Sequence, residues 1–342
     1  MKKGFLVLCL MCVMFTCVSF GVYGESEVFF QPSGQMNIQL AKDSAMLCDA
    51  SYYPVRLQRK LTDMGFEADT IVQKDYETDA LHSAAVTMAR KTVTGVSGEA
   101  CTVYVVVVRG TNNAQEMISN FEVGNGDISS GFRQAAERAY AHWLDYVAQY
   151  PPEKDGDFKV WVCGHSRGAA VANLLAGEYM PRDLKKEQIY GYTFATPNVQ
   201  KTVDVQAPVF NFIIDSDVVT RVPPAEWGFQ RHGTDIHYDQ PMVKHIAINS
   251  REDTDRLLRT FIDGGLTQEN YRQNIEPILA ALGNGDKLED INYTTLLLPI
   301  LQNIDQSTAE DRMNLPEMMR YTQNILPSHT MTTYIAWLDG ME

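Results

Sequence analysis

Ser166 lies at the centre of the pentapeptide Gly164-His165-Ser166-Arg167-Gly168, which has the pattern Gly-x-Ser-x-Gly. An apolar, strand-like run at 159–163 precedes it, and a segment rich in Ala and Leu follows it. A buried strand that turns sharply into a helix is the setting in which such a serine acts as a nucleophile. The sequence therefore predicts a nucleophile elbow at Ser166. The alternative is a tight turn with an inert serine.

The residues around Ser166 fit this chemistry. Gly164 and Gly168 fit such a turn, because a Cβ at either position would clash with the tightly bent backbone. The amide of Arg167 would lie at a helix N-terminus, where unpaired N–H groups favour an anion. It is a candidate donor to the oxyanion of a tetrahedral intermediate.

A second oxyanion donor is expected after an earlier strand. The segment 102–108 is β-branched and apolar, as expected for a central strand covered on both faces. It ends at Arg109-Gly110-Thr111, where the amide and hydroxyl of Thr111 could both face the oxyanion. The alternative is an ordinary loop at the end of a strand.

A serine nucleophile needs a base and an acid that orients the base. In sites of this type the chain order is serine, acid, histidine, which excludes His82, His142 and His165 as the base. Four later histidines remain: His232, His237, His245 and His329.

Two acidic residues, Asp215 and Asp217, follow the apolar strand-like run 209–214. Active sites of open parallel sheets lie at the carboxyl ends of the strands, so either residue is a candidate acid. Spacing alone does not choose between them, and a solvated turn carboxylate is the alternative for each.

Several ordered motifs of this chain resemble the class 3 lipases, the fungal-type triacylglycerol lipases. They are V-V-R-G-T at 107–111, G-H-S-R-G-A-A at 164–170, T-F-A-T-P-N-V at 193–199, D-V-V-T-R-V-P-P at 217–224, W-G-F-Q-R-H-G at 227–233 and S-H-T-M-T-T-Y at 328–334. The resemblance covers roughly residues 40–250 and a short segment around His329.

This resemblance implies an α/β-hydrolase fold and a role for each matching residue. Asp217 begins the D-x-V-x-R-x-P-P motif and corresponds to the family's acid. The late His329, which precedes Tyr334, corresponds to the base, with His237 and His245 as alternatives. Thr111 and Arg167 correspond to the two oxyanion donors.

The elements expected to position these residues alternate between strands and helices. We expect helices at 36–64 (broken near Pro54), 131–149 and 166–180, and strands at 66–72, 84–91, 102–108, 159–163, 189–194 and 209–214. This order predicts an α/β fold, a mostly parallel central sheet with helices on both faces. Residues 252–326 have helical patterns without a convincing strand and predict a helical elaboration, either a cap or extra helices beside the sheet.

The first 24 residues resemble a secretory signal peptide, with Lys2 and Lys3 before an apolar run and a plausible cleavage after Gly24. We therefore expect a secreted protein with one domain over 25–342. An uncleaved membrane anchor is the alternative. Three cysteines remain after cleavage, so the sequence indicates no disulfide framework.

The composition is that of a globular protein, with 45% hydrophobic residues and a formal net charge of −14. Such a negative surface disfavours nucleic acid and anionic membranes. We expect no metal or cofactor, and a lipid or small ester as substrate, either in solution or at a lipid–water interface. Residues 112–128 are either a lid over the site or a packed surface loop. The rival functions are a phospholipase or acyltransferase using the same triad, an amidase, and a non-catalytic binding module.

Overall fold

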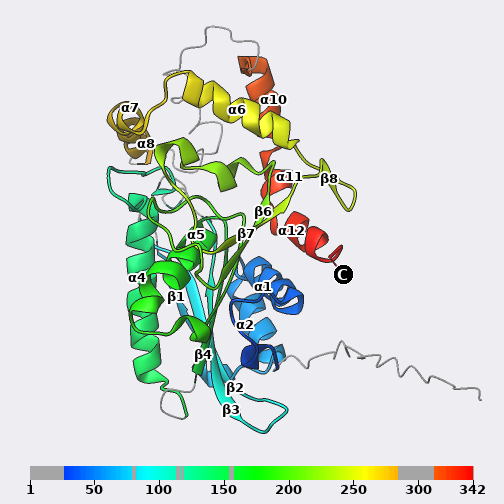
Figure 1. Cartoon of the computed structure of the whole chain (residues 1–342). Coiled ribbons are helices and arrows are strands. Elements are labelled where there is room, and N and C mark those ends of the chain that lie inside the picture. The colour runs from blue at the N-terminus through cyan, green and yellow to red at the C-terminus, as the bar shows by residue number, and fades with distance from the viewer. Residues whose placement is uncertain are drawn as a thin grey trace, which may run out of the picture.

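The computed structural model describes residues 27–78, 82–112, 116, 119–153, 158–283 and 312–341, and its centre is a seven-stranded sheet (Figure 1). The strands lie in chain order: β1 (Val72–Lys74), β2 (Val86–Thr94), β3 (Ala100–Val108), β4 (Phe158–His165), β5 (Ile189–Phe194), β6 (Val209–Ile214) and β7 (Thr234–Tyr238). Strand β2 is antiparallel to both its neighbours, and β3 to β7 are parallel. The predicted mostly parallel α/β sheet is confirmed.

One predicted strand needs correction, and one strand was not predicted. Residues 66–72 do not form a strand, because a 3-10 turn occupies Ala68–Thr70 and β1 begins only at Val72. Ala and Asp in this segment are poor strand formers, and the amide of Thr70 bonds back to the carbonyl of Glu67. Strand β7 was not predicted, since it is a partly exposed edge strand without a continuous apolar pattern.

Helices cover both faces of the sheet (Figure 1). One face carries α1 (Ile38–Ala50), α2 (Pro54–Asp63) and α12 (Met331–Leu338); the other carries α4 (Ser130–Gln149) and α5 (Arg167–Leu174). Alternate residues of β4 belong to the two cores: Trp161 packs with the first group, whereas Val160 and Val162 pack with the second. This alternation follows from the period of two along a strand.

The helix predicted for 166–180 is present, but its type changes along its length. Helix α5 ends at Leu174, a π-helix follows at Leu175–Tyr179, and a 3-10 turn at Met180–Arg182 carries the chain past Pro181. The helices predicted at 36–64 and 131–149 are confirmed, including the break before Pro54.

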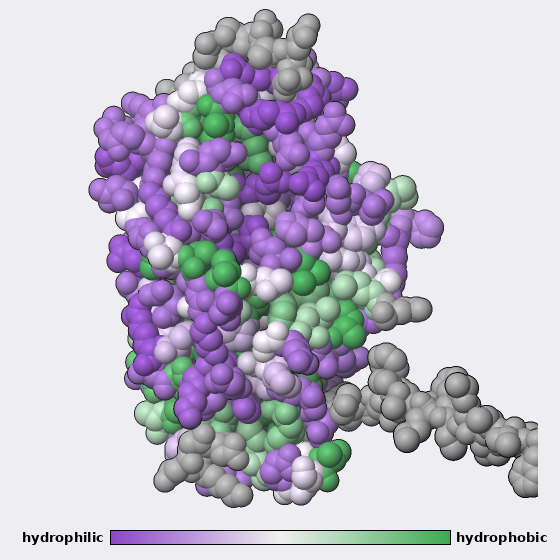
Figure 2. All heavy atoms as spheres, viewed as in Figure 1, coloured by the Kyte–Doolittle hydropathy of each residue, from purple (hydrophilic) through white to green (hydrophobic). Residues whose placement is uncertain are grey.

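The helices after residue 250 gather at one end of the sheet (Figure 1). They are α6 (Arg251–Asp263), α7 (Gln268–Asn274), α8 (Glu276–Gly283), α10 (Leu315–Gln323) and α11 (Ile325–His329). Their apolar side chains form a third core with Val123 and Phe229. Figure 2 shows a small hydrophobic area near the top of the view, where α6 and α7 meet, among hydrophilic side chains.

The remaining described elements are small. A two-stranded hairpin is made of β8 (Met242–Val243) and β9 (Ile246–Ala247), and short 3-10 turns lie at Val218–Arg221 and Ala225–Trp227. Cys48, Cys101 and Cys163 are buried, and no disulfide joins them within the described part of the chain. Within the described ranges, every helix is too short or too polar to cross a membrane.

Candidate active site

The turn between β4 and α5 holds Ser166 in a strained backbone conformation, with φ 58° and ψ −127°. A Cβ added at Gly164 would lie 2.2 Å from the carbonyl oxygen of Gly168, and one at Gly168 would lie 2.3 Å from that of Val108. Neither position tolerates a larger residue without movement of the backbone. The backbone therefore has the sharp strand–turn–helix shape expected of a nucleophile elbow.

Three predicted site residues, far apart in the sequence, meet at this elbow. His329 Nε2 lies 2.8 Å from Ser166 Oγ, and His329 Nδ1 lies 2.8 Å from Asp217 Oδ2. A carboxylate only accepts hydrogen bonds, so Nδ1 of a neutral His329 carries the proton and Nε2 is free to accept from the serine hydroxyl. The three side chains thus form a continuous relay from hydroxyl to carboxylate.

Asp217 is fully buried but well partnered. Besides His329, its Oδ2 accepts a hydrogen bond from Tyr334 Oη at 3.0 Å, and its Oδ1 accepts one from the amide of Val219 at 3.1 Å. These bonds compensate for the loss of water around the carboxylate. Burial, together with the nearby charge of Asp217, raises the pKa of Tyr334 well above its usual value, so Tyr334 stays a hydrogen-bond donor.

His165, inside the elbow itself, holds the backbone of His329. Its Nε2 lies 2.8 Å from the carbonyl oxygen of His329, and its Nδ1 lies 2.8 Å from Tyr52 Oη. Burial and the proximity of His329 lower the pKa of His165 to about 3, so the ring is neutral. Because a carbonyl only accepts, Nε2 carries the proton and Tyr52 donates to Nδ1.

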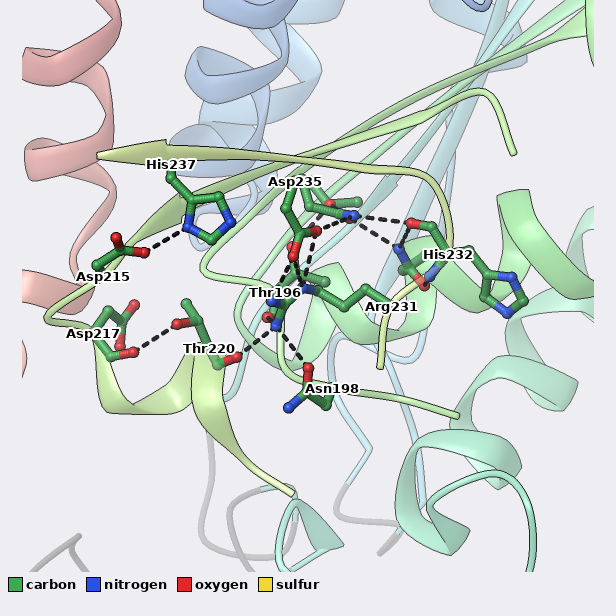
Figure 3. A network of polar contacts seen from close by, with 12 residues as sticks. Thr196, Asn198, Asp215, Asp217, Thr220, Arg231, His232, Asp235 and His237 are labelled. Atoms are coloured by element: carbon green, nitrogen blue, oxygen red, sulfur yellow. Dashed lines mark hydrogen bonds and ion pairs between the residues drawn. The ribbon is translucent and has the colours of Figure 1, made fainter. Parts of the chain in front are cut away.

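Arg231 anchors the turn that carries Asp217 (Figure 3). Its guanidinium donates to the carbonyl oxygen of Thr220 and forms an ion pair with Asp235. The hydroxyl of Thr220 in turn donates to the carbonyl oxygen of Asp217 at 2.8 Å. This network connects the edge of the sheet to the acid of the relay.

The alternative candidates for the acid and the base have other partners. Asp215 accepts from Arg251 and pairs with His237 at 2.6 Å, an arrangement that raises the pKa of His237 (Figure 3). His232 is buried and bonded to the amide of Asp204 and to Gln200. His245 is exposed in the turn between β8 and β9. Of the four candidate histidines, only His329 is hydrogen-bonded to Ser166.

The predicted oxyanion residues lie beside the elbow. Val108 pairs with Gly164 across neighbouring strands, so the loop that follows β3 leaves the same edge of the sheet as Ser166. Thr111 Oγ1 accepts a hydrogen bond of 2.8 Å from Asn120 Nδ2. The side chain of Arg167 is buried, and its Nη1 donates to Asn120 Oδ1 at 3.0 Å. Sequence reasoning missed Asn120, Tyr52 and the side chain of Arg167.

An apolar cavity of about 100 Å³ lies under the C-terminal helices, and several residues that line it are neighbours of the site residues. Asn120 lines it beside the predicted oxyanion loop, and Val218 and Val219 line it beside Asp217. Leu257 and Phe261 of α6 form part of the opposite wall. Such a cavity suits an apolar part of a ligand.

Other parts of the molecule give no competing site among the described residues. A polar cavity of about 320 Å³ between α6 and α10 is lined by residues such as Asp253, Arg256 and Glu317, and neither Asn120 nor Val218 is among them. Within the described ranges, no group of three or more His, Cys, Asp or Glu side chains could hold a metal ion. Part of the predicted lid 112–128, at 113–115 and 117–118, lies outside the described residues, whereas Val123 is buried in the third core.

Solved structures that are similar to part of the chain include three lipases. A fungal lipase solved with an inhibitor is 21% identical over 58% of this chain and 78% of its own, with a TM-score of 0.42. The triacylglyceride lipase of Rhizomucor miehei is also 21% identical over 58% and 78%, with a TM-score of 0.38. The lipase of Rhizopus microsporus var. chinensis is 19% identical over 59% and 75%, with a TM-score of 0.42. No curated protein sequence matches the chain.

The model of the family described as lipase (class 3) matches residues 105–227. This segment runs from β3 to the turn after Asp217 and includes Thr111, Ser166 and Arg167. The match supports a hydrolase of lipid esters. The resemblance predicted from the motifs is thereby confirmed, and residues 105–227 of this chain carry the sequence pattern of a class 3 lipase.

Proposed function

We propose that this protein is a serine hydrolase that cleaves carboxylic esters of lipids through Ser166, His329 and Asp217. One observation carries the proposal: an unbroken relay in which Ser166 Oγ, His329 and Asp217 lie at successive distances of 2.8 Å. This order of hydroxyl, imidazole and buried carboxylate is the arrangement that activates a serine.

In the proposed reaction, His329 Nε2 takes the proton of Ser166 as the hydroxyl attacks the ester carbonyl. Asp217 holds the imidazole in the Nδ1–H tautomer and stabilises the imidazolium that forms. The amides of Thr111 and Arg167 and the Thr111 hydroxyl bind the oxyanion. His329 then gives its proton to the leaving alcohol, and water hydrolyses the acyl-enzyme by the same steps in reverse.

The apolar cavity beside the relay supports an acyl group as the part of the substrate that the protein holds. Its lining offers Val218, Leu257 and Phe261 but few polar groups. We therefore propose esters of apolar acids as substrates. Phospholipids and transfer to another alcohol use the same acyl-enzyme, and product analysis with glycerol and with a phospholipid distinguishes them.

The test of this function is a fluorophosphonate probe together with a panel of p-nitrophenyl esters. The wild-type protein should be labelled at Ser166 and should hydrolyse the esters, whereas Ser166→Ala should lose both properties. Ser97→Ala is the matched control, because Ser97 is an exposed serine in the turn between β2 and β3, at the opposite end of the sheet. Folded wild-type protein that resists the probe and leaves the esters intact would point to the binding module instead. Faster cleavage of anilides than of esters would point to an amidase.

We also propose that the protein is secreted and that residues 1–24 are removed. N-terminal sequencing of the protein recovered from the medium should begin at Glu25. Recovery of the intact sequence from the membrane fraction would instead support the uncleaved anchor.

A further inference from the structure

The side chain that follows the nucleophile is a buried cation. Arg167 is only 1% exposed. The small residues that follow it, Gly168, Ala169 and Ala170, let the helix lie close to the sheet and so bury the guanidinium. Placing a guanidinium in such a site is costly unless all its donors have partners. Its Nε and Nη2 donate to the carbonyl oxygen of Ser83 at 3.3 and 3.1 Å. This leaves Nη1 directed at Asn120.

The contact with Asn120 sets the direction of the next hydrogen bond. A guanidinium has donors and no acceptor, so the side-chain oxygen of Asn120, not its nitrogen, faces Arg167 at 3.0 Å. The amide nitrogen of Asn120 must then face Thr111 Oγ1, to which it donates at 2.8 Å. A hydroxyl that already accepts this bond keeps its own proton for another partner.

We propose that the Arg167 side chain is a positioning residue for the oxyanion hole: by fixing the orientation of the Asn120 amide, it keeps the proton of the Thr111 hydroxyl free for the oxyanion. This inference rests on the proposed function. Without a cation at position 167, the Asn120 amide can turn over and present its oxygen to Thr111. The hydroxyl then donates to Asn120, and the oxyanion loses one donor.

The residues around Thr111 hold its loop in place. A Cβ added at Gly110 would lie 2.8 Å from the carbonyl oxygen of His165, so the loop before Thr111 lies directly against the elbow. The buried carboxylate of Glu116 accepts a hydrogen bond of 2.8 Å from the backbone amide of Asn112 and forms an ion pair with Arg109. These bonds fix the backbone on both sides of Thr111.

The charge of Arg167 persists at neutral pH. Burial lowers its pKa to about 10, while the carboxylates of Glu116 and Glu122 act in the opposite direction. The guanidinium therefore remains a full donor to Asn120 under ordinary assay conditions.

A purely structural role is the alternative, since two of the three donating nitrogens serve the carbonyl oxygen of Ser83. The two roles differ in their dependence on Thr111. A structural defect lowers activity whether or not residue 111 has a hydroxyl, whereas the proposed role disappears when that hydroxyl is removed.

The experiment is a double-mutant cycle with Arg167→Met and Thr111→Val, measured with a soluble p-nitrophenyl ester. Arg167→Met alone should lower kcat at least about tenfold with KM nearly unchanged, since loss of a whole oxyanion donor costs about a hundredfold or more. In the Thr111→Val background, Arg167→Met should change kcat by less than about twofold, because coupled residues are not additive. An equal loss in both backgrounds, or no loss in either, overturns the proposal.

A second pair of variants covers the case in which Arg167→Met does not fold. Asn120→Ala, at a half-buried position, removes the donor to Thr111 Oγ1, so the hydroxyl is no longer held in one orientation. The resulting loss of kcat should therefore again depend on Thr111 and disappear in the Thr111→Val background. Additive losses from Asn120→Ala and Thr111→Val would overturn the inference. Ser166→Ala distinguishes failure of this inference from failure of the proposed function. If Ser166→Ala is inactive and the losses are additive, the proposed function stands and only the role of Arg167 is refuted. If Ser166→Ala is fully active, both are refuted.

Discussion

Replacing Asp217 with asparagine tests the relay at the group that sets the tautomer of His329. In the wild type, Oδ2 of Asp217 accepts from His329 and Tyr334, and Oδ1 accepts from the amide of Val219. An asparagine must place its NH₂ group at one of these two positions. At the Oδ1 position it would face the N–H of Val219, donor against donor.

The other orientation is therefore favoured, with the NH₂ group facing His329 Nδ1. Tyr334 tolerates this orientation because its hydroxyl can also accept a hydrogen bond. His329 tolerates it only by moving its proton to Nε2. That nitrogen then donates to Ser166 Oγ instead of accepting from it, so the base is lost while the packing is kept.

We expect kcat to fall about 10⁴-fold, the loss found when a serine hydrolase triad is held in the wrong tautomer, which corresponds to about 5.4 kcal/mol of transition-state stabilisation. The assay is steady-state hydrolysis of a p-nitrophenyl ester at neutral pH, with circular dichroism to verify folding. Asp215→Asn is the matched control: Asp215 is also buried and also pairs with a histidine, but that partner is His237. Its kcat should stay within about threefold of the wild type. If Asp217→Asn kept more than a tenth of the wild-type kcat, or if Asp215→Asn lost as much, our reasoning about the acid would be wrong.

Two further predictions concern His165 and the cavity. Because the pKa of His165 is about 3 in the folded protein and about 6.5 in the unfolded chain, its contribution to stability is complete above pH 6.5 and is lost as the pH falls towards 3. Between pH 7.5 and 5.5, urea unfolding should therefore show a loss of stability in the wild type that exceeds that of His165→Gln by about 1.4 kcal/mol, and equal losses would contradict the buried neutral ring. Leu257→Trp should fill part of the apolar cavity and lower kcat/KM for octanoate esters at least about tenfold relative to acetate esters. An unchanged ratio would show that the acyl group binds elsewhere.

The sheet was predictable wherever an element is buried on both faces. Strands β5 and β6 have the predicted bounds, since each is a short apolar run between turn residues. Strand β7 lacks that pattern because it is an edge strand, and its pairing with β6 depends on contacts rather than on its own composition. The error at 66–72 has a related cause, because a buried Phe66 at the start of the segment is compatible with a turn as well as with a strand.

The candidate site shows a similar limit. The backbone shape at Ser166 follows from five consecutive residues, and it was predictable from them. Assigning His329 needed the family resemblance, because 112 residues separate it from Asp217 and spacing cannot choose among four histidines. The partners of His165 are 113 and 164 residues away, so no local pattern contains them. The one local signal for Arg167 was a cation among small residues at the start of a helix expected to pack against the sheet.

The position of His329 near the C-terminal end of the described chain has a consequence for biosynthesis. A ribosome completes the parallel strands, the elbow and the acid of the relay well before it adds α11 and α12. Helix α12 packs on α1, so a helix that is made after the sheet packs on one that is made before it. A nascent chain can therefore assemble most of its sheet while it still lacks the imidazole. Esterase activity should therefore appear only after translation of α11 and α12, and the proposed enzyme stays inactive while these two helices are still to be made.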